Sequence, residues 1–315
     1  MEPRTLKLGT RASPLAMRQA GLVADALRDR WPGLEVTLVP IKTSGDRMLD
    51  APLATVGGKG LFVKEIEEAL LAGRIDLAVH SLKDMPVELP PGLRIGAVMA
   101  REDPLDALVA KHDLRFAELP VGAKIGTSSL RRQVQLLHRR PDLQLVPLRG
   151  NVETRLKKIE ALGLDAVVLA AAGLIRLRLQ DRITERLEPD LCLPAIGQGA
   201  LAIEVRSNDR QVEAFVEGVD HAETRLATEA ERAFLRCLGG TCVTPLAAFG
   251  RLEGDTLVLQ GMVGSLDGKR LVRQVRQGEA SAPDAVGRAL ADALLAAGGE
   301  EILRDIDEEL VARRR

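Results

Sequence analysis

The stretch AVHSLKDMP, residues 78–86, sets opposite charges side by side at the end of an apolar run. The run predicts a buried strand, and Lys83 and Asp84 follow it just before a proline. A strand that delivers a cation and an anion together is a candidate for ligand binding and for acid–base catalysis. His80 and Ser81 are expected to orient this turn. The alternative is that Lys83 and Asp84 form an exposed turn pair.

Arginines gather where helices are predicted to begin. In GTRASPLA, the pair Ser13-Pro14 is a strong N-terminal signal, with serine as the cap and proline in the first turn. In GTSSLRRQ the first turn itself carries two arginines, which face the positive end of the helix dipole at a cost of about 0.3–1 kcal/mol each. An anionic ligand would turn that cost into a stabilisation. The residues concerned are Arg11, Ser13, Ser128, Ser129, Arg131 and Arg132.

Two further loops also carry arginines. In PLRGNVETR, Arg149 ends a predicted strand and Arg155 follows a cap at Asn151, and in LAAAGLIR a strand leads to Arg176. Helix N-termini offer free N–H donors, and the guanidinium fork binds carboxylates or phosphates at two points. The clustering at strand–helix junctions therefore predicts a polyanion site. The alternative is a set of solvated surface arginines, because the chain has 44 Lys plus Arg.

Two other kinds of site are disfavoured. The segment GGKG fails as a phosphate loop, because that motif needs Ser or Thr after the lysine and Gly60 stands there instead. Lys59 is then a flexible loop lysine at a helix start. The cysteines Cys192, Cys237 and Cys242 are odd in number and form no CxxC pair, so we expect neither a disulfide framework nor a metal site.

Composition narrows the class of protein. The chain of 315 residues is 46% hydrophobic and 28% charged, which is typical of a globular protein with two or three domains. A net charge of -1 and an aromatic content of 2% argue against nucleic acid as a partner. The N-terminus lacks the apolar core of a signal peptide and no long apolar run occurs, so we expect a cytoplasmic protein without membrane contact.

The elements that must position these residues alternate between strand and helix. Strand-like runs cover 6–8, 36–41, 75–79, 107–109, 124–125, 144–147, 166–170 and 200–205, and helical patterns cover 14–30, 61–72, 130–139 and 152–161. This alternation predicts an α/β fold with parallel or mixed sheets and ligand loops at the carboxyl ends of strands. KLGTRASPLAMRQA and KIGTSSLRRQVQL both run from a strand through Gly-Thr into a helix, which suggests two similar lobes.

The pattern of predicted strands and helices changes after about residue 218. A helix is expected over 222–238, followed by GGTCVTP, by strand-like runs at 247–252, 256–262 and 270–277, and by a final helix over 282–295. This pattern is typical of a small α+β domain.

Eight segments in order resemble the porphobilinogen deaminase (hydroxymethylbilane synthase) family. They are GTRASPLA, KTSGD, GGKGLFVKEIE, AVHSLKDMP, GTSSLRRQ, LRGNVETRL, LPAIGQGALAIEVR and ERAFLRCLGGTCVTP, and they span residues 5–250. The resemblance implies a deaminating transferase that condenses four porphobilinogens into the linear tetrapyrrole hydroxymethylbilane for porphyrin and haem biosynthesis. It also implies a monomer and a dipyrromethane cofactor built from the substrate, attached by a thioether to Cys242.

The resemblance further implies two lobes like those of periplasmic binding proteins, with the chain crossing between them twice. Lobe 1 would comprise residues 1–99 and 200–217, lobe 2 residues 100–199, and the C-terminal α+β domain residues 218–315. The second crossing would lie near Ile196–Leu201. One departure from the family is Thr241, since the residue before the cysteine is more often Gly, Ser or Ala, and a β-branched residue narrows the choices of the loop backbone.

The resemblance assigns roles residue by residue. Asp84 would stabilise the cation left by loss of ammonia, Lys83 would face substrate carboxylates, and Lys59 would belong to a mobile loop, so these three are the expected catalytic residues. The cofactor would be held by Cys242, Ser13, Lys83, Asp84, Thr127, Ser128, Ser129, Arg131, Arg132, Arg149, Gly150 and Arg155. The substrate would be bound by Arg11, Ser13, Gln19, Arg149, Arg155 and Arg176.

A second hypothesis is a two-lobed binding protein for a small anion, without catalysis. Its lobes and arginines would look the same, but it would need neither Asp84 nor Cys242. The missing signal peptide counts against a periplasmic receptor.

Overall fold

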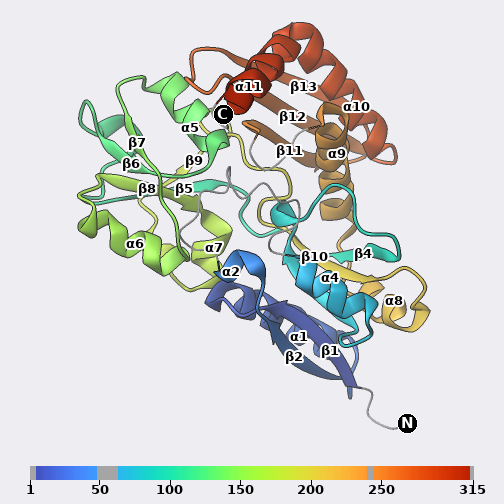
Figure 1. Cartoon of the computed structure of the whole chain (residues 1–315). Helices are drawn as coiled ribbons and strands as arrows, with labels where there is room; N and C mark the ends of the chain where they lie inside the picture. The colour runs from blue at the N-terminus through green and yellow to red at the C-terminus, as the bar shows by residue number, and fades with distance from the viewer. Residues whose placement is uncertain (1–4, 48–62, 240–243, 313–315) are drawn as a thin grey trace. The chain divides into compact units, whose positions relative to one another are not determined.

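The computed structural model describes residues 5–47, 63–239 and 244–312 (Figure 1). These residues fold into two compact units. The first unit comprises residues 5–47, 63–102 and 199–225, and the second comprises residues 103–198, 226–239 and 244–312. The chain therefore leaves the first unit after Glu102 and returns to it at Gly199.

The first unit is built around one five-stranded sheet with the order β2-β1-β3-β10-β4. β1 runs parallel to β2 and β3, whereas β10 runs antiparallel to β3 and β4. The elements are β1 (Thr5–Arg11), α1 (Pro14–Arg30), β2 (Glu35–Ile41), α2 (Ser44–Arg47), α4 (Lys64–Leu71), β3 (Leu77–Ser81), the 3-10 turn η1 (Leu82–Asp84), β4 (Leu93–Val98), β10 (Leu201–Arg206) and α8 (Arg210–Glu217).

Helices cover both faces of this sheet because its strands are apolar on both sides. Val23 and Leu27 of α1 pack in one cluster with Val79 of β3. On the other face, Ile66 of α4 packs in a cluster with Ala78. Successive residues of β3 thus face α1 and α4 in turn, and His80 shares the α4 side with Ala78.

The second unit contains a five-stranded sheet with the corresponding order, β7-β6-β8-β5-β9. β6 runs parallel to β7 and β8, and β5 runs antiparallel to β8 and β9. The elements are β5 (Asp106–Ala110), η2 (Phe116–Glu118), β6 (Lys124–Gly126), α5 (Leu130–Arg139), β7 (Gln144–Val146), α6 (Val152–Ala161), β8 (Ala166–Ala170), α7 (Ala171–Arg176), η3 (Gln180–Arg182) and β9 (Glu185–Leu187). The expected likeness between β1–α1 and β6–α5 is confirmed.

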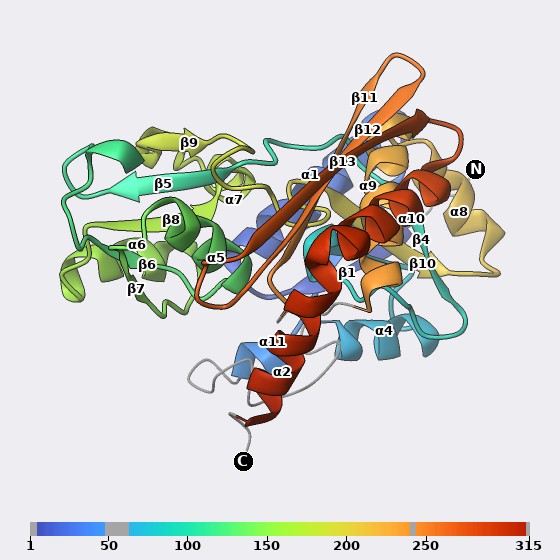
Figure 2. The same ribbon diagram turned by 90° about the horizontal axis from the view of Figure 1, so that it is seen from above.

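The second unit also contains an antiparallel three-stranded sheet, β11-β12-β13. Its strands are β11 (Leu246–Glu253), β12 (Thr256–Gly264) and β13 (Leu271–Glu279), and its helices are α9 (Ala222–Leu238), α10 (Pro283–Leu294), the π-helical turn η4 (Leu295–Gly299) and α11 (Glu300–Ala312). α9 and α10 lie on one face of the sheet, where Phe234 packs with Leu259 and Leu290 (Figure 2). The opposite face packs on Val134 of α5 through Met262.

The expected fold class, two mixed sheets with helices and a small α+β part at the C-terminal end, is confirmed. The edge strands β4 and β9 and the helix α11 were not expected from the sequence. The domain boundaries at residues 99, 199 and 217 stay a prediction. Within the part of the chain that the structure describes, no helix has both the length and the apolar character needed to cross a bilayer.

Candidate functional site

Lys83 and Asp84 lie in η1, directly after the central strand β3. The strand hydrogen bonds continue into this turn, because the Leu82 N–H donates to the Ala200 carbonyl at 3.0 Å. Leu82 is buried, Lys83 is half-buried and Asp84 is exposed. The carboxylate is thus open to a ligand at the carboxyl end of a strand, where α/β proteins place their ligands.

Side chains on both faces of the sheet hold the end of β3. On the α1 side, the Ser81 hydroxyl lies 3.0 Å from Nε2 and 3.3 Å from Oε1 of Gln19. On the α4 side, Nε2 of His80 lies 3.0 Å from Oε2 of Glu204. The expectation that His80 and Ser81 orient the turn is consistent with these contacts, and Gln19, expected to bind substrate, is buried here with its amide on Ser81.

Glu67 of α4 adds a third ionisable group beneath the end of β3. Its side chain is buried, and burial, reinforced by the charge of Glu204, raises the pKa of its carboxyl to about 7, while His80 acts in the opposite direction. Glu67 therefore changes its charge near neutral pH.

The start of α1 fits its sequence signal. Ser13 is the N-cap, its Oγ accepts from the Ala16 N–H at 3.3 Å, and Pro14 opens the helix. Arg11, at the end of β1, is partly exposed. This junction therefore places an arginine and a capping serine together at the carboxyl end of β1.

The start of α5 holds a buried charge cluster. Asp106, at the first position of β5, is fully buried. Arg131 Nη1 lies 2.6 Å from its Oδ2, and Arg132 Nη2 lies 2.7 Å from its Oδ1. Burial opposes ionisation of Asp106, but the two guanidinium groups outweigh it and hold the pKa of the carboxyl well below its ordinary value. Two cations against one anion leave one net positive charge at the helix start.

Two further residues contact the same carboxylate. Gln198 Nε2 donates to Asp106 Oδ1 at 3.1 Å, and the Cys192 thiol donates to Oδ2 at 3.2 Å. Burial, and then the negative charge of Asp106, raise the pKa of Cys192 to about 12. Cys192 is thus a protonated, buried thiol and a poor nucleophile.

The hydroxyl-bearing residues before α5 differ in whether their hydroxyl groups make hydrogen bonds. The Ser128 hydroxyl is committed to the backbone of Leu148, donating at 2.9 Å and accepting at 2.8 Å. Thr127 is buried, and its Oγ1 accepts from the Ser129 N–H at 3.2 Å. Ser129 is the N-cap residue, yet its side chain makes no cap hydrogen bond. Its hydroxyl is therefore not needed by the helix.

The remaining arginines of the expected set follow β7 and β8 along the chain of the second unit. Asn151 caps α6 through Thr154 N–H at 2.8 Å, and Arg155 Nε donates to the Gly150 carbonyl at 2.8 Å. Gly150 has a φ of +107°, and a Cβ there would lie 2.7 Å from Thr154. Arg149 is partly exposed, whereas Arg176 at the end of α7 is buried.

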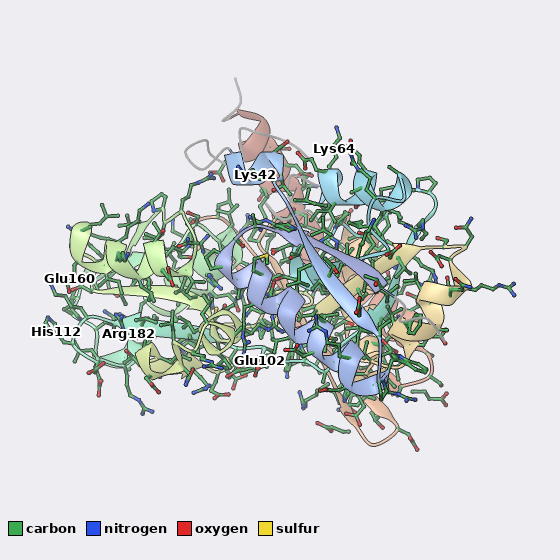
Figure 3. The ribbon with its side chains drawn as sticks, turned by 90° about the horizontal axis from the view of Figure 1, so that it is seen from below. Lys42, Lys64, Glu102, His112, Glu160 and Arg182 are labelled. Atoms are coloured by element: carbon green, nitrogen blue, oxygen red, sulfur yellow. The ribbon has the colours of Figure 1, made fainter. Side chains whose placement is uncertain are left out.

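Two expected residues, Lys59 and Cys242, lie outside the described residues. On either side of the gap before α4, the exposed lysines Lys42 and Lys64 are labelled in Figure 3. The third cysteine, Cys237, is exposed near the end of α9. Within the described ranges, no group of three or more His, Cys, Asp or Glu side chains could hold a metal ion.

Sequence reasoning missed four buried polar residues of these clusters: Glu67, Asp106, Gln198 and Glu204. A signal existed for two of them, since Asp106 opens the apolar run DALVA and Glu204 interrupts the apolar run LAIEV. A charged residue inside such a run is rarely buried unless it is paired.

Two family models match the chain. The model described as "Porphobilinogen deaminase, dipyromethane cofactor binding domain" matches residues 6–214, and "Porphobilinogen deaminase, C-terminal domain" matches residues 225–296. The chain is 54% identical over 316 residues to "Porphobilinogen deaminase" of Geotalea uraniireducens (strain Rf4), covering 100% of this chain and 99% of the relative. It is also 54% identical over 311 residues to the protein of that name in Geobacter sulfurreducens, covering 98% and 97%.

Similar solved structures include a TRAP periplasmic solute binding protein from Desulfovibrio salexigens. It is 13% identical, has a TM-score of 0.43, and the match covers 73% of this chain and 74% of that one.

Proposed function

The chain belongs to the porphobilinogen deaminase family, and from that premise we propose which of its residues carry the reaction. The enzyme condenses four porphobilinogen molecules into hydroxymethylbilane with release of ammonia, in tetrapyrrole biosynthesis. It is a deaminating transferase with a dipyrromethane cofactor, as the family model for residues 6–214 indicates. A small-anion binding protein without catalysis is not favoured.

Asp84 is the proposed catalytic carboxylate. Porphobilinogen loses its protonated amino group as neutral ammonia: the C–N bond breaks, its electron pair leaves with the nitrogen, and the resulting cation is delocalised onto the pyrrole nitrogen. A fixed carboxylate that accepts a hydrogen bond from that N–H stabilises the developing charge, an effect of about 2.7–4 kcal/mol per group. The new C–C bond then requires the attacked ring carbon to lose a proton, which the same carboxylate can accept. Lys83, the adjacent cation, and Lys59 are proposed to assist.

The cofactor and the growing chain carry acetate and propionate groups, so their binding requires cations. The described residues fit such a group, because the Asp106 cluster keeps one net positive charge at the N-terminus of α5 and the Ser129 hydroxyl is not used by the helix. We propose that the following residues hold the carboxylates of cofactor and substrate: Arg11, Ser13, Gln19, Thr127, Ser128, Ser129, Arg131, Arg132, Arg149, Gly150, Arg155 and Arg176. When bound, the dipyrromethane supplies the anchored pyrrole chain that the reaction extends.

Cys242 is the proposed attachment point of the cofactor. Cys192 is a poor candidate, because it is buried and its pKa is raised to about 12. Cys237 lies near the end of α9 rather than in the glycine-rich segment GGTCVTP. A thioether requires a reactive thiolate that can reach the substrate-derived carbon.

The observation that carries the catalytic proposal is the exposed carboxylate of Asp84 at the end of a strand held on both faces. Asp84→Asn keeps the shape and removes the charge, so kcat should fall by about 100- to 1,000-fold while the cofactor stays attached. Porphobilinogen consumption measures kcat, and intact mass measures the cofactor. Glu88→Gln, an exposed acid in the same loop, is the control, and near-normal turnover by Asp84→Asn would remove Asp84 from the mechanism.

Intact mass also tests the attachment. Cys242→Ser should lack the mass of two pyrrole units, whereas Cys237→Ser and the wild type should carry it. An adduct retained by Cys242→Ser would assign the thioether to another residue.

We further propose that the enzyme works as a monomer in the cytoplasm, and light scattering of the holoenzyme tests the oligomeric state.

A further inference from the structure

Three ionisable side chains are buried together where α4 covers the first sheet. They are Glu67 on α4, His80 on β3 and Glu204 on β10, with exposed fractions of 7%, 5% and 0%. The rest of this face is apolar, with Ile66, Ala69, Leu70, Ile75, Ala78 and Leu93 in one cluster. Buried ionic groups are often no more stabilising than apolar replacements, so stability alone gives no reason for three of them here.

The three groups are arranged around one hydrogen bond. Glu204 pairs across the sheet with Ala78, two residues before His80, so both side chains lie on the same face. Nε2 of His80 lies 3.0 Å from Oε2 of Glu204, within hydrogen-bond distance. The other oxygen of Glu204, Oε1, is buried without a hydrogen-bond partner among the described residues, and so is Oε1 of Glu67.

This cluster lies at the end of β3, the strand that leads into the turn with Asp84. His80 is the last residue of β3 on the α4 side, and Ser81 is bonded to Gln19 on the α1 side. The Leu82 N–H is bonded to the carbonyl of Ala200, the residue just before β10, which carries Glu204. The turn with Asp84 therefore starts from a strand end that is fixed from both faces and from the neighbouring strand.

We propose that His80 and Glu204, with Glu67 packed over them, are positioning residues that fix the Asp84 carboxylate for the reaction. The inference rests on the catalytic role proposed for Asp84. None of the three is proposed to touch the substrate. Their effect arises because a catalytic group must be held within a fraction of an ångström, and a shift of about 1 Å can cost about 100-fold in rate.

The test uses Glu204→Gln and His80→Gln in the cofactor-loaded enzyme. Each variant should lower kcat by about 10-fold or more and change KM by less than about twofold, because substrate carboxylates are bound by other residues. The double variant should be no slower than the slower single variant, since both act through one hydrogen bond. Glu213→Gln, which removes a carboxylate bonded to Arg94 on the same sheet, is the matched control and should keep the wild-type kcat.

The outcomes separate this inference from the role of Asp84. Turnover by Asp84→Asn at the wild-type rate would overturn the role of Asp84 itself. An inactive Asp84→Asn beside a folded, cofactor-loaded Glu204→Gln with normal kcat would overturn only the positioning role. Losses that multiply in the double variant, or that appear in KM rather than kcat, would likewise overturn it. Circular dichroism and intact mass confirm folding and loading before kinetics are measured.

Discussion

The two five-stranded sheets share a strand order but carry opposite charges at related places. In each, the fourth strand of the order holds a fully buried acid, Glu204 on β10 and Asp106 on β5. In the first sheet the partners are one histidine and a second acid, Glu67, so the cluster is acidic. In the second sheet the partners are Arg131 and Arg132, and the cluster keeps a net positive charge.

This difference suits the two sheets to the different roles proposed for them. The first sheet ends in an exposed carboxylate, Asp84. The buried acids of this sheet, Glu67 and Glu204, bring no positive charge to it. The second sheet presents Arg131 and Arg132 at a helix N-terminus, where Asp106 is the one carboxylate among the described residues that pairs with them, and it neutralises them in part. A chemistry that generates a cation on a substrate rich in carboxylates needs both environments, one negative and one positive.

Removing the acid of the second sheet should have the largest effect on stability. Asp106→Asn leaves two buried guanidinium groups without their counter-charge, so the free energy of unfolding should fall by about 3–5 kcal/mol. Chemical denaturation at pH 7 measures it. The pKa of Asp106 is depressed, so its stabilisation is present above pH 4 and is lost as pH falls towards its folded-state pKa; the gap between variant and wild type should shrink in acid.

The control for Asp106 is an exposed ion pair. Asp25 lies 3.0 Å from Arg28, and its side chain is 63% exposed. Asp25→Asn should change the free energy of unfolding by less than about 1 kcal/mol. Equal losses in the two variants would mean that burial of Asp106 does not make its pairs strong.

The first sheet should respond to pH in the opposite direction. The pKa of Glu67 is raised from 4.5 to about 7, so the folded state holds a proton that the unfolded state releases. The stability that Glu67 contributes is then greatest below about pH 4.5 and falls as pH rises to about 7, by up to about 3 kcal/mol. Glu67→Gln should abolish this fall and be more stable than wild type at pH 8, as measured by denaturation across that range.

Glu68→Gln is the matched control for Glu67. Glu68 is the next residue of α4 and is exposed. The wild-type slope with pH should persist in this variant. A Glu67→Gln enzyme with the same slope would show that the carboxyl of Glu67 ionises in the fold as freely as in the unfolded chain.

Much of both sheets could be predicted from sequence, because the hydrophobic periodicity of strands and helices and the capping residues of helices are local signals. The pairs β1–α1 and β6–α5 follow from Gly-Thr turns and capping residues. The edge strands β4 and β9 were missed: β4 carries Arg94 and Gly96 within its run, and β9 has three residues, two of them charged. α11 was missed because charges dominate it, with Ile302 and Ile306 as its buried residues, and Gly298 at φ +99° separates it from α10.

The charge clusters could be predicted only in part, because they depend on residues far apart in the chain. The helix dipole predicts that Arg131 and Arg132 need an anion, and the sequence suggests a ligand. The fold supplies Asp106 as part of that anion, 25 residues before Arg131, and the sheet alone brings it there. Glu204 lies 124 residues from His80, so the strand pairing of β10 with β3 was needed to join them.

The smallest expected effect compares the two helix caps. Ser13 accepts from the Ala16 N–H, so Ser13→Ala should lower the free energy of unfolding by about 1 kcal/mol. Ser129 occupies the same position of α5 without a cap bond, so Ser129→Ala should stay within about 0.5 kcal/mol of wild type. Denaturation of both variants at one pH measures the contrast.

Turnover should distinguish the two serine variants further. A hydroxyl that the helix does not use is open to a carboxylate of the cofactor or substrate, so Ser129→Ala should slow turnover or cofactor loading while leaving stability unchanged. A Ser129→Ala enzyme with wild-type loading and kinetics would mean that the Ser129 hydroxyl contributes neither to the stability of α5 nor to the binding of cofactor or substrate. The net charge of the Asp106 cluster would then act on the ligand through the arginines alone.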